Sequence, residues 1–278
     1  MKIIISGHKG FLGSALVNKL QLSHDVMGIS KSESHSNSQI KEYKSSELIT
    51  VKEKPDVLIM CHAAVSNSNT IIETQLLFDS NVAFTADLIK QFPESYFLFI
   101  SSISVYGHQE ISINENSQTS PLTEYAISKL WGEQIVRKTK RHGILRLSSV
   151  FGENMKENTI IPNYVNQAMK NGVIEVWGNG ERRQNYFHVS DAVAYIEMII
   201  TNKIEGVFLG TSSKEFSNIE LANIISKETS ATVKLVNSDN SKSFAFDNKS
   251  TREILGITSE KEFTTGIKEY IYWKQKQS

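Results

Sequence analysis

The stretch "KIIISGHKGFLGSALVNKLQ", residues 2–21, joins an apolar run to a helical pattern through a turn that is rich in glycine. Residues 2–6 form a short apolar run, which is typical of a buried strand. Leucines recur every four positions over residues 11–21, as on one face of a helix. A glycine turn between a strand and a helix is the context in which backbone N–H groups bind a pyrophosphate, so the stretch predicts a dinucleotide site.

The three glycines of this turn have separate physical roles. Gly7 permits a sharp turn, Gly10 lets the backbone approach a pyrophosphate, and Gly13 lets the helix pack closely on the strand. The spacing is GxxGxxG, whereas GxGxxG is the commoner form. A purely structural glycine turn in an unrelated α/β protein is the alternative interpretation.

Strands and helices continue to alternate up to about residue 152. Apolar runs predict strands at 25–30, 55–64, 96–102 and 143–152, and helical patterns cover 70–92 and 122–141. Continuous apolar strands that alternate with helices indicate a parallel sheet covered on both faces. Later residues predict helices, a strand pair around Gly178 and Gly180, and a late helix capped by Ser217 or Asn218.

Composition excludes several classes of protein. The 278 residues contain 30 Lys+Arg and 30 Asp+Glu, so the balanced charge argues against a nucleic-acid or membrane-surface partner. The apolar runs are too short for a signal peptide or a membrane span. The single cysteine, Cys61, allows no internal disulfide and is expected to be a small buried thiol. The histidines form no metal-ligand pattern, and we expect a cytoplasmic protein without a metal.

Several motifs in order along the chain carry a resemblance to a known family. They are "GHKGFLG", "CHAA", Asn81, "SSISVYG", "YAISK", "LRLSSVFG", "WGNGERRQNYFHVSDAV" and "DNKSTREILG". Together they resemble the extended short-chain dehydrogenase/reductases, the NAD(P)-dependent nucleotide-sugar epimerase/dehydratase family. The resemblance implies a Rossmann-type doubly wound parallel sheet, formed by residues 1–152 plus about 186–204. It also implies a smaller C-terminal substrate-binding lobe, formed by about 153–185 and 205–278.

The stretch "PLTEYAISKLWGEQ", residues 121–134, supplies the chemistry that this family implies. Tyr125 and Lys129 are four residues apart and share a helix face, so the ammonium is expected to lower the pKa of the phenol. By resemblance, Tyr125 is the catalytic tyrosine and Lys129 its partner, which also binds the nicotinamide ribose. Ser102 corresponds to the catalytic serine at the end of a strand.

The resemblance also implies a cofactor site. Its expected residues are Gly7, Lys9, Gly10, Phe11, Leu12, Gly13, Ser30, Lys31, Ala63, Ala64, Asn81, Tyr125 and Lys129. The second strand ends without the acidic residue that usually binds the adenosine ribose of NAD. Lys9, Ser30 and Lys31 occupy that neighbourhood and suit a 2′-phosphate, so NADP is favoured over NAD. The alternative is that either lysine is a solvated surface charge.

Two reactions remain open for a nucleotide-sugar substrate. Sugar 4,6-dehydratases carry an acid just before the "YG" motif, where this chain has Ser104 and Val105, so dehydration is disfavoured. Epimerisation at C4, or reduction of a 4-keto sugar, needs only hydride transfer and the Ser-Tyr-Lys set. The residues expected to bind the substrate are Ser104, Ser149, Arg182, Arg183 and Gln184, and which of the last three meets the diphosphate is left open.

Two other functions compete with these reactions. The first is a non-catalytic NADP-binding regulatory protein, but such relatives usually lose the tyrosine or lysine. The second is a reductase of a non-sugar carbonyl, against which the "WGNGERRQNYFHVSD" stretch argues. The resemblance further implies a homodimer that pairs through the helices near residues 70–92 and 122–141.

Overall fold

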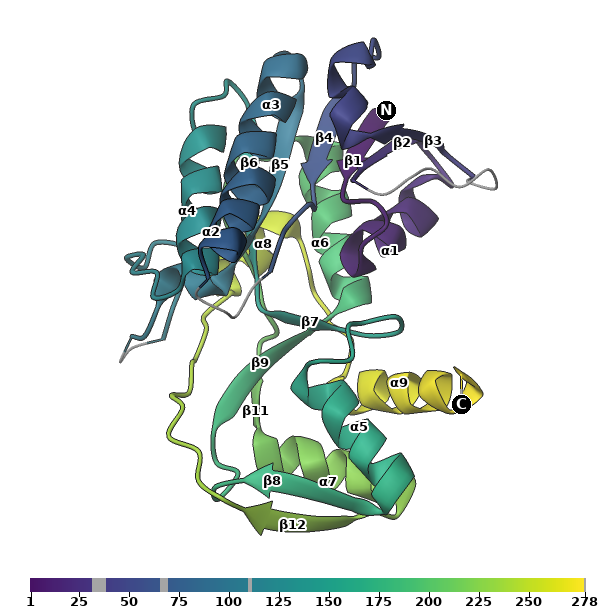
Figure 1. Cartoon of the computed structure of the whole chain (residues 1–278), viewed down its shortest axis with the longest axis vertical. Helices are drawn as coiled ribbons and strands as arrows, with labels where there is room; N and C mark the ends of the chain where they lie inside the picture. The colour runs from purple at the N-terminus through teal and green to yellow at the C-terminus, as the bar shows by residue number, and fades with distance from the viewer. Residues whose placement is uncertain (32–38, 66–69, 110–111, 278) are drawn as a thin grey trace. The chain divides into compact units, whose positions relative to one another are not determined.

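The computed structural model of the chain describes residues 1–31, 39–65, 70–109 and 112–277, which form two units (Figure 1). The first unit comprises Met1–Gly107, Glu115–Leu147 and Ala192–Gly210. The second comprises His108–Asn114, Ser148–Asp191 and Thr211–Ser278. Among the described residues, no helix combines the length and the apolar character that crossing a membrane would require.

A seven-stranded parallel sheet forms the centre of the first unit, in the order β10-β6-β5-β4-β1-β2-β3. The strands are β1 Lys2–Ser6, β2 Asp25–Ser30, β3 Lys41–Lys44, β4 Val57–Met60, β5 Tyr96–Ser102, β6 His142–Leu147 and β10 Gly206–Gly210. The chain begins in the middle of the sheet and winds outwards in both directions, so the predicted Rossmann-type fold is confirmed.

Helices cover both faces of this sheet (Figure 1). They are α1 Phe11–Leu20, α2 Ile71–Leu77, α3 Phe84–Gln91, α4 Glu124–Val136 and α6 Val189–Asn202. Shorter helical turns are η1 Ser45–Thr50, η2 Phe78–Ala83 and η3 Ile103–Tyr106. The predicted helix over 70–92 is therefore interrupted, because η2 is a π-helical turn between α2 and α3.

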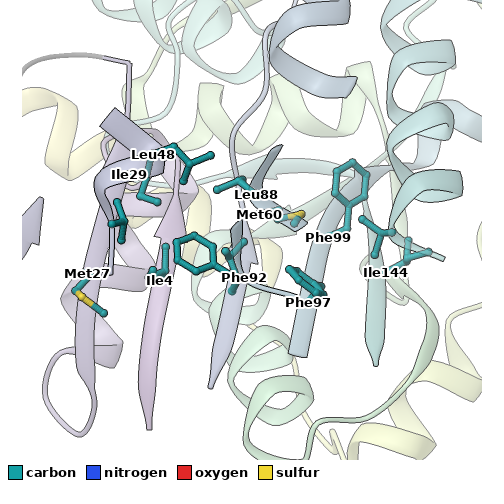
Figure 2. Packing of buried hydrophobic residues seen from close by; sticks show 13 residues of the cluster. Ile4, Met27, Ile29, Leu48, Met60, Leu88, Phe92, Phe97, Phe99 and Ile144 are labelled. Atoms are coloured by element: carbon teal, nitrogen blue, oxygen red, sulfur yellow. The ribbon is translucent and has the colours of Figure 1, made fainter. Parts of the chain in front are cut away.

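Apolar side chains from neighbouring strands pack under α3 and α4. Figure 2 shows Ile4, Met60, Phe97 and Phe99 from the sheet beside Leu88 of α3. All five side chains are fully buried. Their uniform burial along each strand explains why the strands read as continuous apolar runs in the sequence.

The second unit contains two small sheets. One has the order β11-β9-β7, and the other pairs β12 with β8. These strands are β7 Ser149–Phe151, β8 Val173–Trp177, β9 Arg183–His188, β11 Glu215–Ser217 and β12 Thr232–Val236. The helices are α5 Ile160–Asn171, α7 Asn218–Thr229, α8 Lys249–Leu255 and α9 Phe263–Gln277, and Ser217 caps α7.

Three details of this architecture differ from the sequence expectation. The strands around Gly178 and Gly180 do not pair with each other, because β8 joins β12 while β9 joins β7 and β11. The backbone continues β6 almost directly into β7, but Ser148 separates them and β7 lies in the second unit. The sequence predicts that residues from about 205 belong to the substrate lobe, whereas β10 extends the central sheet beside β6.

Candidate active site

The glycine turn between β1 and α1 has the geometry of an anion site. Gly7 has a φ of +76°, and a Cβ there would lie 2.7 Å from the backbone nitrogen of His62. A Cβ on Gly13 would overlap the carbonyl oxygen of Gly7, so both positions require glycine. Gly10 precedes α1, whose first turn carries no acidic side chain. The positive end of the helix dipole is therefore available to a phosphate group.

A cavity of about 450 Å³ lies beside this turn. Residues from the predicted cofactor site that line it are Gly7, Lys9, Gly10, Ser30, Lys31, Ala63 and Ala64. Phe11, Leu12 and Gly13 form the first residues of α1 instead. The carboxyl ends of β1, β2 and β4 thus contribute to one cavity, as a dinucleotide site of this fold requires.

Asn81 holds one edge of this cavity in place. It is fully buried in the π-helical turn η2, and its amide oxygen accepts a hydrogen bond from the Ala64 N–H at 2.8 Å. The amide nitrogen donates to the Ala64 carbonyl at 3.0 Å and to the Ser128 hydroxyl at 2.9 Å. Asn81 therefore fixes the loop after β4 against α4, next to Lys129.

Tyr125 lies in the first turn of α4, which begins after Thr123. The Thr123 hydroxyl accepts a hydrogen bond from the Ala126 N–H at 3.2 Å and caps the helix. Burial raises the pKa of Tyr125, and a hydrogen bond with Ser102 opposes that rise. The structure thus brings Ser102 and Tyr125 together, as the resemblance implies.

Lys129 follows one helical turn later and is almost completely buried. Its ammonium donates to the Ile100 carbonyl at 2.6 Å and lies 4.7 Å from the centre of the Phe99 ring. Burial lowers the pKa of Lys129 to about 8, against the opposing charges of Cys61 and Glu133. The expectation that Lys129 depresses the pKa of Tyr125 is wrong for this structure, because desolvation of the phenol dominates and its pKa rises.

A buried ion pair lies one turn beyond Lys129. The guanidinium of Arg146 on β6 binds both carboxylate oxygens of Glu133, at 2.9 and 2.6 Å. Ser101 donates to the same carboxylate at 2.6 Å, and Arg146 lies over the Tyr106 ring at 4.6 Å. The network joins α4, β5, β6 and η3, which are the elements around Ser102 and Lys129.

Both lysines expected to bind a 2′-phosphate already have partners. The Lys9 ammonium lies 3.2 Å from a carboxylate oxygen of Glu42 on β3. The Lys31 ammonium donates to the Ser80 hydroxyl at 2.6 Å. Lys9 is largely shielded and ion-paired, whereas Lys31 is an exposed residue, as the alternative interpretation of the sequence has it.

The second unit has its own cavity, of about 530 Å³. Arg182 lines it, and the Arg182 Nε atom is buried without a hydrogen-bond partner among the described residues. Arg183 instead donates to the Glu215 carbonyl at 2.5 Å and pairs with Glu220. Gln184 donates to Asn218 at 2.8 Å. Of the three candidates for the diphosphate, Arg182 is therefore the one with donor capacity that faces a cavity.

Two further predicted residues lie on separate elements. Ser104 is in η3, and its hydroxyl is buried without a hydrogen-bond partner in the described part of the chain. Ser149 begins β7 with an exposed side chain. An unpaired buried hydroxyl is costly, so Ser104 has capacity for a ligand.

Sequence reasoning missed several residues around the first cavity. His62 lines it and shares hydrogen bonds with Ser6 at 2.7 Å and Thr85 at 3.0 Å. Burial lowers the pKa of His62 to about 3, so the ring is neutral at physiological pH. Cys61 is half-buried and also lines the cavity, although burial raises its pKa to about 12. Both residues directly follow β4, and residues at the carboxyl ends of strands line ligand sites in this type of sheet, so this position could have predicted their place in the cavity.

Comparison with known proteins matches residues 3–208 to the family described as "NAD dependent epimerase/dehydratase family". A "Putative UDP-glucose 4-epimerase" from Methanocaldococcus jannaschii is 29% identical over 81% of this chain and 82% of its own length. A "dTDP-glucose 4,6-dehydratase" from Streptomyces niveus is 26% identical over 64% of this chain and 56% of its own. The fold also matches a UDP-glucuronic acid 4-epimerase from Bacillus cereus, solved with UDP-glucuronic acid and NAD, with a TM-score of 0.88, 19% identity and all of both chains covered.

The comparisons correct the cofactor prediction. The preference for NADP is wrong, because structural neighbours of this chain were solved with NAD. A physical reason lies at Lys9, because its ammonium is already paired with the Glu42 carboxylate. The family model covers nearly three quarters of the sequence, and the motifs identified above lie in register with the fold. The chain therefore belongs to the NAD dependent epimerase/dehydratase family.

Proposed function

We propose that this protein is an NAD-dependent 4-epimerase of a UDP-sugar. The observation that carries the proposal is the grouping of Ser102, Tyr125 and Lys129 at the end of β5 and on α4, with serine rather than an acid at position 104. A relative named as a putative UDP-glucose 4-epimerase and another named as an uncharacterised UDP-glucose epimerase support the choice of reaction. Neighbours solved with UDP-glucose or UDP-glucuronic acid support the choice of nucleotide.

The first unit holds NAD in the cavity beside the glycine turn. Gly10 and the N-terminus of α1 bind its pyrophosphate, and the loop of Ala63 and Ala64, clamped by Asn81, forms the opposite wall. When bound, NAD supplies a reversible hydride acceptor. The positive charge of Lys129 contacts its ribose, a role that the buried ammonium can take by exchanging its bond to Ile100.

Proton transfer falls to Tyr125 and Ser102. Ser102 binds the oxygen on C4 of the sugar, and Tyr125 removes the proton of that hydroxyl as the C4–H bond breaks. Burial raises the pKa of Tyr125 and favours the protonated phenol in the free protein, whereas the positive charges of Lys129 and of a bound oxidised nicotinamide ring would favour its ionisation. Epimerisation would be completed when Tyr125 returns the proton to the C4 oxygen while C4 regains the hydride, which bound NADH would supply, on the opposite face of the 4-keto sugar.

The cavity of the second unit binds the nucleotide. Arg182 binds the diphosphate with the buried Nε that has no other partner among the described residues. Trp177 exposes 58% of its surface and lines the same cavity, where the ring can stack on the base. Asn163 and Asn218 line it too and offer amide groups to the edge of the base.

Ser104 separates this reaction from dehydration. Removal of water from a 4-keto sugar needs an acid beside the leaving hydroxyl, and a serine hydroxyl is far too weak an acid for that role. The buried hydroxyl of Ser104 instead has capacity to hydrogen-bond the sugar. Epimerisation and simple 4-keto reduction both remain compatible with this residue, and the requirement for cofactor distinguishes them.

Turnover of defined sugars tests the proposal. Purified protein with a catalytic quantity of NAD is incubated with UDP-glucose and, separately, with UDP-glucuronic acid, while proton NMR follows the anomeric signals. The 4-epimer of at least one substrate should accumulate. A 4-keto-6-deoxy product would identify a dehydratase instead. Stoichiometric oxidation of NADH by a 4-keto sugar, without epimerisation, would identify a reductase.

The proposed assembly is a homodimer formed through α2 and α4. Ile72, Leu76, Ile127 and Trp131 are 45–82% exposed on these two helices. Trp131 packs edge-on against Phe78 of the adjoining π-helical turn, with ring centres 5.5 Å apart. So much apolar surface on one pair of helices is unusual for a monomer and suits a self-complementary two-fold contact.

A further inference from the structure

Glu42 is a buried carboxylate directly behind the glycine turn. Its side chain is 9% exposed, and its strand, β3, pairs with β2 so that Glu42 lies opposite Gly28. One carboxylate oxygen lies 3.0 Å from the His8 Nε2 atom, and the other lies 3.2 Å from the Lys9 ammonium. Both partners come from the phosphate-binding turn itself.

Gly28 makes this arrangement possible. A Cβ at position 28 would lie 2.5 Å from the Nδ1 atom of the His8 ring, so any larger residue would exclude that ring. The ring crosses the open backbone of β2 and reaches β3. Consequently the turn between β1 and α1 is held to a strand two positions away in the sheet.

The position of Lys9 in the cofactor cavity connects the ion pair with Glu42 to the binding of the adenosine ribose. Lys9 lines the cofactor cavity together with Ser30 and Lys31, at the end of β2, where an adenosine ribose lies in this type of fold. Its ammonium is 22% exposed and paired with Glu42. A 2′-phosphate would have to compete with this carboxylate for Lys9 and would also be repelled by it, whereas a 2′-hydroxyl meets neither cost.

We infer that Glu42 is a specificity-determining residue that selects NAD against NADP by pairing with Lys9. This inference rests on the proposed function, since it concerns the cofactor of the same site. The selecting carboxylate comes from β3 and acts through a lysine, rather than from the end of β2 onto the ribose.

Calorimetric titration with NAD and with NADP tests the inference without any sugar substrate. The first variant is Glu42→Gln, which keeps a side-chain oxygen beside His8 and removes only the charge. NADP affinity should rise about tenfold or more, the usual size of one charge-assisted phosphate contact. NAD affinity should stay within about twofold, which is below the effect of losing one ordinary hydrogen bond.

Two further variants identify the cause of any gain. Glu53→Gln is the matched control, because it also removes one carboxylate. Glu53 pairs with Lys41, which lies on β3 like Glu42. It should leave both affinities unchanged. Adding Lys9→Met to Glu42→Gln should abolish the gain in NADP affinity. An equal gain in Glu53→Gln, or a gain that survives loss of Lys9, would overturn the inference.

A fourth variant tests the inference even if Glu42→Gln does not fold. Lys9→Met alone replaces a partly exposed side chain and leaves the Glu42 carboxylate without this cation. NADP binding should weaken several-fold relative to NAD, and an unchanged ratio of the two affinities would overturn the inference. If the wild-type protein binds neither dinucleotide, the proposed function itself fails. If the wild-type protein binds NAD but Glu42→Gln leaves the affinity for NADP unchanged, only the inference about Glu42 fails.

Discussion

Tyr125 combines a half-buried ring with a reactive oxygen, and one substitution separates the two. Tyr125→Phe keeps the ring and its packing, so the midpoint of thermal unfolding should change little. NAD binding should persist, because the glycine turn and Lys129 are untouched. Epimerisation should slow by roughly 10²–10⁴, the usual contribution of a positioned acid–base group. Turnover at the wild-type rate would exclude Tyr125 as the proton carrier.

Lys129 gives a pH-dependent signature. Burial lowers its pKa from 10.5 to about 8, so between these values the unfolded chain binds more protons than the folded one. The cost of burying the ammonium is complete below pH 8 and disappears towards pH 10.5. The free energy of unfolding of the wild-type protein should therefore rise, relative to Lys129→Met, between pH 8 and 10.

Denaturation with urea, without NAD, measures this difference at pH 7, 8, 9 and 10. The comparison with Lys129→Met cancels the titration of all other groups that the two proteins share. A difference that is constant across this range would show that Lys129 has an ordinary pKa in the folded protein.

The sequence predicted the identities of these residues better than their electrostatics. Tyr125 and Lys129 are neighbours on one helix, so their spacing alone brings them together. The pKa of Tyr125 depends on burial by other elements, which no local pattern reveals. The same limitation explains the cofactor error, since the partner of Lys9 is Glu42 on a separate strand.

At the scale of elements, the pair of Glu133 and Arg146 joins α4 to β6 under the active site. Both side chains are nearly or fully buried, so removal of Arg146 leaves the Glu133 carboxylate without solvent and with only the more distant Arg137, 3.9 Å away, as an ion-pair partner. Arg146→Met should cost about 3–5 kcal/mol of the free energy of unfolding. Combining it with Glu133→Gln should recover part of that loss, because the carboxylate that has lost Arg146 is then replaced by a neutral amide.

Chemical denaturation of the single and double variants tests this account. The exposed pair of Lys249 and Glu253 on α8 supplies the control, and Lys249→Met should change stability by less than about 1 kcal/mol. Equal losses at the two sites would mean that the buried pair has no special role.

Elements whose sequence pattern lies within one stretch of the chain were predicted correctly. The pairing of strands whose partners lie far along the chain was not. The turn from β1 into α1 carries its glycines and its apolar periods within one stretch of sequence. The partners of β8 and β9 lie far along the chain, so two adjacent strands were interpreted as one pair. The π-helical turn η2 also has no distinct local pattern, because its ends continue α2 and α3.

For the whole molecule, dimerisation depends on the apolar surface of α2 and α4. Trp131→Glu places a charge in the proposed contact while keeping a residue that favours a helix. Light scattering at micromolar concentration should show a dimer for the wild-type protein and a monomer for this variant. Leu235→Glu is the control, because Leu235 is equally exposed on β12 of the second unit. A wild-type monomer, or an equal effect of both variants, would contradict the proposed contact.

The central claim is that hydride leaves C4 of a UDP-sugar and returns to the same carbon. The most direct measurement uses UDP-glucose or UDP-glucuronic acid that carries deuterium at C4, incubated with the protein and a catalytic quantity of NAD in ordinary water. Proton NMR should show the 4-epimer with deuterium retained at C4, because the transferred hydride does not exchange with solvent. Absence of the epimer, or an epimer that has lost its deuterium to water, would contradict the account.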